Sequence, residues 1–471
     1  MSFNDVLTKI NDVMYTYILI ILLIGIGVFF TIRTKGAQFR LFGDGLKSIM
    51  EPTDKGKEGE KKVSSFQALM ISTASRVGTG NIAGIATAIA AGGPGAVFWM
   101  WLMAVIGGAS ALVESTLAQI YKVKDKGQFR GGPSYYMERA LGKRWLGILF
   151  SILLIICFAY GFNGLQAYNI SSAFEYYIPA YSSTIWPMVV GIVLAVGFAL
   201  VIWGGTHRIG FISSVIVPIM ASIYIVMGLV IMIMNITELP GVIAMILKEA
   251  FDIKAIMGGF AGSAVVLGIK RGLFSNEAGM GSAPNASASA DVEHPIKQGL
   301  VQVISVFIDT ILICSSTAFM LLLSGVEGKK GVLDGIPYVQ AAIKANVGEW
   351  GIHFITFSIF AFAFTSLIGN YCYAESNILF IKNNKILLNV FRITCLAAVF
   401  LGAQADFGVV WNIADVTMGL MAIVNIIAMF MLRKVVLKVL AHYEKQKKEG
   451  KKPVFYEEEV GLTGTIWTRE K

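Results

Sequence analysis

The chain has 471 residues, of which 55% are hydrophobic and 15% are charged, and its mean hydropathy is +0.68. A soluble domain cannot bury that much apolar surface, so the composition excludes a soluble protein and indicates a polytopic α-helical membrane protein. Lys and Arg outnumber the acidic residues by 39 to 30, an excess better explained by basic loops that orient membrane helices than by nucleic-acid binding.

The first apolar run, 12–32, has no basic segment before it and no small-residue cleavage site. We therefore predict a retained membrane helix rather than a signal peptide. The four cysteines lie in apolar segments without metal-binding or CxxC spacing, and the chain has no P-loop. These features predict no cofactor, no metal centre of the zinc type and no direct use of ATP.

Runs of about 20 apolar residues are long enough to cross a bilayer, and eleven of them are predicted. Between them, Phe39–Met50 and Leu333–Asn346 are predicted as interfacial helices, and the tail after Leu440 as disordered or loosely helical. The crossings are predicted at 12–32, 64–90, 94–120, 145–175, 183–203, 209–234, 254–286, 297–324, 350–380, 386–403 and 408–433.

Basic residues predict the orientation of these helices, because Lys and Arg accumulate in cytoplasmic loops. Thirty of the 39 lie in the loops and tail on one side of the predicted topology, and six lie on the other. We therefore expect a multi-pass protein of the cell membrane with its amino terminus outside and its carboxyl terminus in the cytoplasm.

Two of the predicted helices contain polar, glycine-rich interruptions. The run Arg76-Val-Gly-Thr-Gly-Asn81 interrupts the second crossing, and Leu267 to Pro284 interrupts the seventh. Interrupted helices in matching positions of two halves are typical of carriers built from inverted repeats, with the binding site between them. We therefore predict five plus five helices and one extra helix. The parts are 1–32 (extra helix), 33–63 (cytoplasmic loop), 64–234 (first repeat), 254–433 (second repeat) and 434–471 (cytoplasmic tail).

At the first interruption, backbone amides at the start of the second half-helix are suited to a substrate carboxylate. The carbonyls of Ala74 and Val77, which end the first half-helix, are suited to a cation. The alternative is that the glycines only permit close helix packing. The amides in question belong to Gly78, Thr79, Gly80 and Asn81.

At the second interruption, Phe274 is a candidate aromatic wall beside the substrate, and Ser275 and Asn276 are candidate polar contacts. Charged residues at this depth need partners. Arg271 pairing with Glu277, or Arg76 pairing with Glu277, would provide one. Such a pair would be either a gate or a purely structural contact, and the sequence leaves both open.

Three further segments carry candidate site residues. Gln166 and Asn169 follow Asn163 on a polar stripe, which could bind substrate or join helices. Thr365 and Ser366 can direct hydroxyl oxygens to a cation together with the carbonyl of Phe362, although such residues often bond to their own helix. The remaining intramembrane acids are candidate proton or ion relays. They are Glu114, Asp309, Glu375 and Asp415, of which Asp415, near Trp411, is a candidate gate residue.

The stretch Gly92-Gly-Pro-Gly-Ala-Val-Phe-Trp-Met-Trp-Leu-Met-Ala-Val-Ile-Gly107 resembles the signature of the alanine or glycine:cation symporter family. RVGTGNIAG and LFSNEAGMGSAP, as well as the eleven-helix outline, resemble the same family over nearly the whole chain. The resemblance implies the leucine-transporter fold of the amino acid–polyamine–organocation group and inward symport of alanine or glycine. It also implies one Na⁺ as the coupling ion, bound by Ala74, Val77, Phe362, Thr365 and Ser366. Arg76 departs from relatives that bind a second Na⁺.

The resulting hypothesis is a symporter rather than an enzyme, whose partners are Na⁺, a small neutral amino acid and the lipid bilayer. Proton coupling through Glu277 or Asp415 is the nearest alternative. An ion channel, a less favoured alternative, would have a continuous polar pore and no substrate saturation, and the pair of broken helices argues against it. An intramembrane enzyme would need a catalytic dyad or metal set, which the sequence does not offer.

Overall fold

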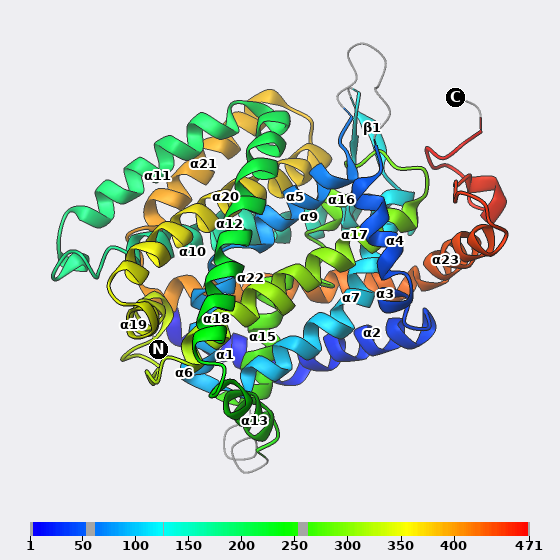
Figure 1. Ribbon diagram of the computed structural model, residues 1–471. Helices are drawn as coiled ribbons and strands as arrows, with labels where there is room; N and C mark the ends of the chain where they lie inside the picture. The colour runs from blue at the N-terminus through cyan, green and yellow to red at the C-terminus, as the bar shows by residue number, and fades with distance from the viewer. Residues whose placement is uncertain (1–2, 53–61, 126, 253–261, 470–471) are drawn as a thin grey trace.

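A computed structural model describes residues 3–52, 62–125, 127–252 and 262–469. Nearly all its regular structure is helical, and its sheet is a two-stranded hairpin of β1 (Val123–Asp125) and β2 (Gln128–Arg130). The long helices form one bundle (Figure 1), with the N-terminus and the helix α19 (Gly335–Val347) at one end. The hairpin, α4 (Phe42–Met50), α23 (Arg433–Lys448) and the C-terminus lie at the opposite end. We call these ends the α19 face and the α23 face.

The extra helix and the first repeat follow the predicted order. The extra crossing is one continuous helical run made of α1 (Phe3–Val13), η1 (Met14–Leu19) and α2 (Ile20–Arg33). Two short helices follow it, α3 (Ala37–Arg40) and α4. The first repeat contains α5 (Ser65–Arg76), η2 (Thr79–Asn81), α6 (Ala83–Gly92), α7 (Ala96–Ile120), α8 (Pro133–Arg139), α9 (Arg144–Leu154), η3 (Ile155–Phe162), α10 (Asn163–Ser172), η4 (Tyr181–Ser183), α11 (Trp186–Ile202) and α12 (Gly205–Met234). Helix α13 (Leu239–Ala250) follows it, outside the predicted range 64–234.

The second repeat begins with the other interrupted helix and ends before α23. The predicted start of this crossing, 254–261, lies outside the described residues. Its helices are α15 (Ala264–Asn276), α16 (Pro284–Ser287), α17 (Pro295–Phe307), η6 (Ile308–Cys314), α18 (Ser315–Leu322), α19, α20 (Trp350–Ile381), α21 (Lys385–Gly402) and α22 (Phe407–Met431), and the tail adds η7 (Glu457–Val460).

The number of crossings agrees with the prediction. Among the described residues, eight helical runs are long and apolar enough to span a membrane, and α11 is a shorter apolar helix. The interrupted helices α5–α6 and α15–α16 make up the remaining two. The all-α membrane fold is therefore confirmed.

Capping residues place the helices next to the site. Ser64 and Gln67 form a reciprocal capping box at the start of α5, with hydrogen bonds of 3.1 and 3.0 Å. His294 accepts the amide proton of Ile296 and Pro295 occupies the first turn of α17. Each device satisfies helix amides that otherwise lack partners, so each helix begins at a defined residue.

Three features depart from the sequence predictions. The hairpin and α13 were not predicted, because three-residue strands and one short amphipathic helix carry little periodic signal. Of the two alternatives predicted for the tail after Leu440, a helix is present as far as Lys448, and disorder is wrong. Helix α23 continues to Lys448, and the segment beyond it buries Phe455 and Val460 at 1% and 6% exposure. Apolar contacts with the bundle order this otherwise charged tail.

Candidate substrate and cation site

The first interruption lies between α5 and α6, where the sequence places it. Helix α5 ends at Arg76, Gly78 is extended, and the short η2 turn precedes α6. The amide of Gly78 donates to Oδ1 of Asn81 over 3.0 Å, and the amide of Thr79 donates to Oε1 of Gln166 over 3.1 Å. Side chains therefore satisfy these amides, which the helix break leaves without helical partners.

Oxygen atoms converge where α5 ends. The hydroxyl of Ser366, on α20, lies 3.0 Å from the carbonyl oxygen of Ala74 and 3.2 Å from that of Val77. The same hydroxyl lies 3.0 Å from the carbonyl oxygen of Phe362, and the hydroxyl of Thr365 lies 2.9 Å from that oxygen. The structure thus brings together all five residues predicted to hold a cation. Hydroxyl and carbonyl oxygens are ligands that hard cations prefer.

Two glycines of the first interruption allow this close approach. A Cβ atom on Gly78 would lie 2.4 Å from Oγ of Ser366 and 2.9 Å from Nε2 of Gln166. A Cβ atom on Gly80 would lie 2.7 Å from the ring of Phe274. All three distances are shorter than a carbon atom tolerates. The glycines therefore allow close packing around the site, in addition to breaking the helix.

The second interruption is held open by a carboxylate. Helix α15 ends at Asn276, and Glu277 follows with a φ of 55°, in the left-handed region that few non-glycine residues adopt. Glu114, on α7, accepts the amide protons of Gly279 and Gly281 over 3.1 and 3.0 Å. Glu114 therefore satisfies the unwound backbone, a role that the sequence alone did not reveal.

Residues of the two interruptions meet in one buried polar cluster. The side-chain amide of Asn81 donates to Oδ1 of Asp309 over 2.7 Å and to Oγ of Ser275 over 3.0 Å. Ser275 itself donates to Asp309. Phe274 packs between Phe162 and Trp411. Among the predicted acids, Asp309 is thus the one that joins both interruptions.

The polar stripe of the third core helix divides into different contacts. Gln166 meets the first interruption, but Asn169 donates to the carbonyl of Leu165 in its own helix. Asn163 accepts a proton from Asn370. Asn276, predicted as a substrate contact, uses Oδ1 to accept the amide proton of Ala278.

The predicted ion pairs of Glu277 do not form. Arg271 and Lys270 each lie 2.6 Å from the carboxylate of Asp415, and no ion pair joins Glu277 to either arginine. Glu277 accepts protons from Ser75 and Ser282 over 3.0 and 2.6 Å. The partners differ because α22 brings Asp415 up to α15, a proximity that chain order does not indicate.

Arg76 also has a different partner from the predicted one. Its Nη1 donates to Oε1 of Gln302, on α17, over 3.0 Å, and its Nε and Nη2 have no hydrogen-bond partner. The side chain is buried, with 2% of its surface exposed. It therefore supplies a positive charge between the interruptions, where three carboxylates lie buried.

Different structures lie on the two sides of this region. On the α19 side of Phe274, the guanidinium of Arg271 covers Trp411, with its carbon 4.4 Å from the ring centroid, and binds Asp415. From the α23 face, a cavity lined by Lys62, Arg130 and Glu375 at one end reaches Ile71 and Tyr373. Ser75 lies one helical turn beyond Ile71.

The sequence of this chain matches the model of the sodium:alanine symporter family over residues 1–457. The chain belongs to this family. It is 49% identical to the amino-acid carrier protein AlsT of Bacillus subtilis, covering 100% of this chain and 98% of AlsT. It is 48% identical to the probable sodium/glutamine symporter GlnT of the same organism, covering 95% of this chain and 92% of GlnT.

Membership of the family makes the chain a transporter and not an enzyme. Its fold resembles the crystal structure of MhsT in complex with L-phenylalanine, with a TM-score of 0.51 and 14% sequence identity. That match covers 88% of this chain and 95% of MhsT. The likeness extends over most of both chains and supports the leucine-transporter fold.

Proposed function

We propose that this chain is a secondary active symporter that carries alanine or glycine into the cell together with Na⁺ by alternating access. The convergence of Ala74, Val77 and Phe362 carbonyl oxygens on the Ser366 hydroxyl carries the proposal. Na⁺ would bind among these oxygens with Thr365, and the Ser366 proton would turn away from the ion. Carriers with broken helices bind their coupling ion to unwound carbonyls in this way.

The substrate would bind beside the ion. Its carboxylate would take the place of the Gln166 side chain at the Thr79 amide, at the positive end of α6. Its ammonium group would meet polar atoms near Ser275 or Asn276. The ring of Phe274 and the close packing at Gly78 and Gly80 leave little room, which favours a substrate with a small side chain. Ion and substrate would each stabilise the other's site, and such coupling is reciprocal.

We propose that this arrangement is a state open toward the inside. The basic loops predict that the α23 face is cytoplasmic and that the amino terminus is outside. The contacts of Arg271, Asp415 and Trp411 then form the closed outer gate, while the cavity leading to Tyr373 forms the inner pathway. Rocking of the helices would open one side as it closes the other.

Uptake into proteoliposomes tests the proposal. Labelled alanine, glycine and glutamine are offered separately, first with an inward Na⁺ gradient and then with a pH gradient alone. We expect alanine or glycine uptake that requires Na⁺ and saturates with substrate. Uptake that does not depend on Na⁺ would refute Na⁺ as the coupling ion. A preference for glutamine would refute alanine or glycine as the substrate.

Proton coupling is the second candidate, and one observation favours it. Glu277 is 1% exposed and accepts hydrogen bonds from two serine hydroxyls, but has no ion pair. A buried carboxylate without an ion pair of its own is suited to take up a proton. If protons drive transport, Glu277→Gln should abolish uptake driven by a pH gradient; under Na⁺ coupling, Na⁺-driven uptake should persist in this variant.

A further inference from the structure

Two histidines from distant parts of the chain meet on the α23 face. His294 precedes α17, and His442 belongs to α23, 148 positions later. Nε2 of His294 lies 3.3 Å from Nδ1 of His442, and the rings are stacked with centroids 5.5 Å apart. His294 is fully buried, against Tyr443 and Phe455.

The hydrogen bonds around the pair define where its protons are. Nδ1 of His294 accepts the amide proton of Ile296, so the ring proton of His294 is on Nε2 and is donated to His442. Nδ1 of His442 is then an acceptor, and its Nε2 lies 2.8 Å from the carboxylate of Glu459. The amide nitrogen of Gln446, which donates to Val454, lies 2.9 Å from the same Nε2. His294 therefore carries one ring proton, on Nε2, and is neutral, with both of its ring nitrogens in hydrogen bonds.

A further proton does not fit this arrangement. On His294 it would point at the amide of Ile296, and on His442 it would point at the N–H of His294. Either addition turns a hydrogen bond into a contact between two donors. The positive end of α17 and the Lys297 ammonium also disfavour a charge on His294. Burial, His442 and Lys297 together lower the pKa of His294 well below its ordinary value.

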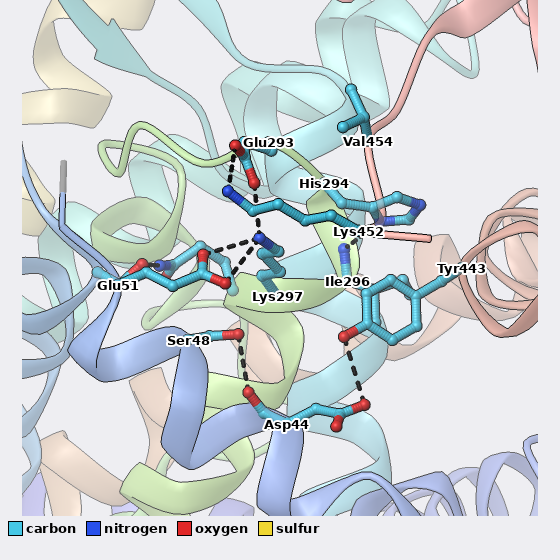
Figure 2. A network of polar contacts seen from close by, with 12 residues as sticks. Asp44, Ser48, Glu51, Glu293, His294, Ile296, Lys297, Tyr443, Lys452 and Val454 are labelled. Carbon is cyan, nitrogen blue, oxygen red and sulfur yellow. Dashed lines mark hydrogen bonds and ion pairs between the residues drawn. The ribbon is translucent and has the colours of Figure 1, made fainter. Parts of the chain in front are cut away.

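The carboxylates near the two histidines are paired with nearby cations. Figure 2 shows the Lys297 side chain, 3% exposed, between Glu51 and Glu293, at 2.7 and 2.9 Å. Lys452 of the tail binds the other oxygen of Glu293 at 2.7 Å. On the side of His442, Glu459 also pairs with Arg469 at 2.5 Å. Tyr443, beside His294, donates to Asp44, which Lys447 also binds. The cations thus already neutralise the carboxylates.

These contacts join the tail to the face where the inner cavity opens. The amide of Phe455 donates to the carbonyl of Glu293, and the indole of Trp467 donates to the carbonyl of Gln119 at the end of α7. Trp467 lines a cleft together with Lys62 and Phe129, and both of these residues also line the inner cavity. The docked tail therefore forms a wall beside the mouth of that cavity.

We propose that His294 and His442 form a pH-sensitive latch that holds the C-terminal segment, residues 433–467, against α17, and that acidification of the α23 face releases it. The docked state accommodates only a neutral His294, whose ring can take up a second proton after release. Docking is therefore at full strength above the ordinary histidine pKa of about 6.5 and weakens as the pH falls below it. Release would uncover the cleft between Trp467 and Phe129.

Hydrogen exchange of the full-length protein in lipid nanodiscs tests the latch directly, and it does not depend on the transported substrate. Exchange of peptides covering 450–467 is compared at about pH 7.5 and about pH 5.5, on either side of the ordinary histidine pKa, after correction for the intrinsic rate. We expect about tenfold faster corrected exchange of the Phe455 and Glu457 region at the lower pH. Equal corrected rates at the two pH values would overturn the proposal.

Three variants test whether His294 causes the pH dependence of exchange. His294→Asn retains a capping side chain for α17 but cannot titrate, so its corrected exchange should not depend on pH. His353→Asn removes a histidine on α20 that bonds Tyr177, away from the tail, and should keep the wild-type response. Lys452→Met removes an exposed ion pair and should also keep the wild-type response to pH. A wild-type response in His294→Asn, or its loss in His353→Asn, would contradict the latch.

Discussion

The hydroxyl oxygen of Ser366 lies 3.0 Å from the carbonyl oxygen of Ala74, a residue 292 positions earlier in the chain. The contact joins α20 of the second repeat to the end of the interrupted helix of the first repeat. It brings a side-chain oxygen to carbonyls that the break has freed from helical hydrogen bonds. The proposed coupling ion would therefore depend on both repeats at once.

Removing this hydroxyl should weaken Na⁺ dependence specifically. We expect Ser366→Ala to raise the Na⁺ concentration for half-maximal uptake about tenfold, which corresponds to about 1.4 kcal/mol of binding free energy. Thr365→Ala should act in the same direction. Ser358→Ala is a matched control, because Ser358 is buried on the same helix and its hydroxyl has no hydrogen-bond partner. An unchanged Na⁺ requirement in Ser366→Ala would argue against the cation site.

A methyl group at Gly78 should abolish binding without unfolding the protein. Its Cβ atom would lie 2.4 Å from Ser366 Oγ and would displace the oxygens of the site. Gly78→Ala should therefore show no saturable uptake, while its elution in size-exclusion chromatography stays unchanged. Gly25→Ala, on α2, places a methyl group where no atom lies within 4 Å and should transport normally. Normal uptake by Gly78→Ala would contradict the predicted site.

Asp415 pairs with two cations, so the loss of its charge should destabilise the protein more than the loss of either cation. Asp415→Asn leaves Lys270 and Arg271 buried without a countercharge, and breaking a buried pair in this way costs about 3–5 kcal/mol. Lys270→Gln leaves the Arg271–Asp415 pair intact and should be milder. Thermal unfolding in detergent should give a clearly lower Tm for Asp415→Asn than for Lys270→Gln. A lower Tm for Lys270→Gln than for Asp415→Asn would contradict this prediction.

Glu114 should be required for the shape of the second interruption. In Glu114→Gln, one acceptor oxygen remains for the amides of Gly279 and Gly281, and an unsatisfied buried amide costs about 1–3 kcal/mol. We expect a lower Tm and weaker alanine binding by calorimetry. Glu375→Gln is the comparison, since Glu375 lies on α20 and pairs with Arg392, away from the interruption. Equal losses of alanine binding in the two variants would refute this role.

The sequence by itself determined the membrane class, the crossings and the places of both interruptions. These features follow from local properties: apolar length, and glycine and polar residues inside a helix. The convergence of Ala74 and Ser366 was also expected, but from resemblance to a family rather than from any local signal.

Tertiary structure alone decided which buried charges meet. Arg271 binds Asp415 rather than Glu277, Asp309 joins Asn81 to Ser275, and the tail folds onto His294. A charge in a membrane needs a partner, but any carboxylate at the same depth can provide it. The choice depends on how helices far apart in the chain pack together, and that packing energy is spread over many weak contacts that no short stretch of sequence contains.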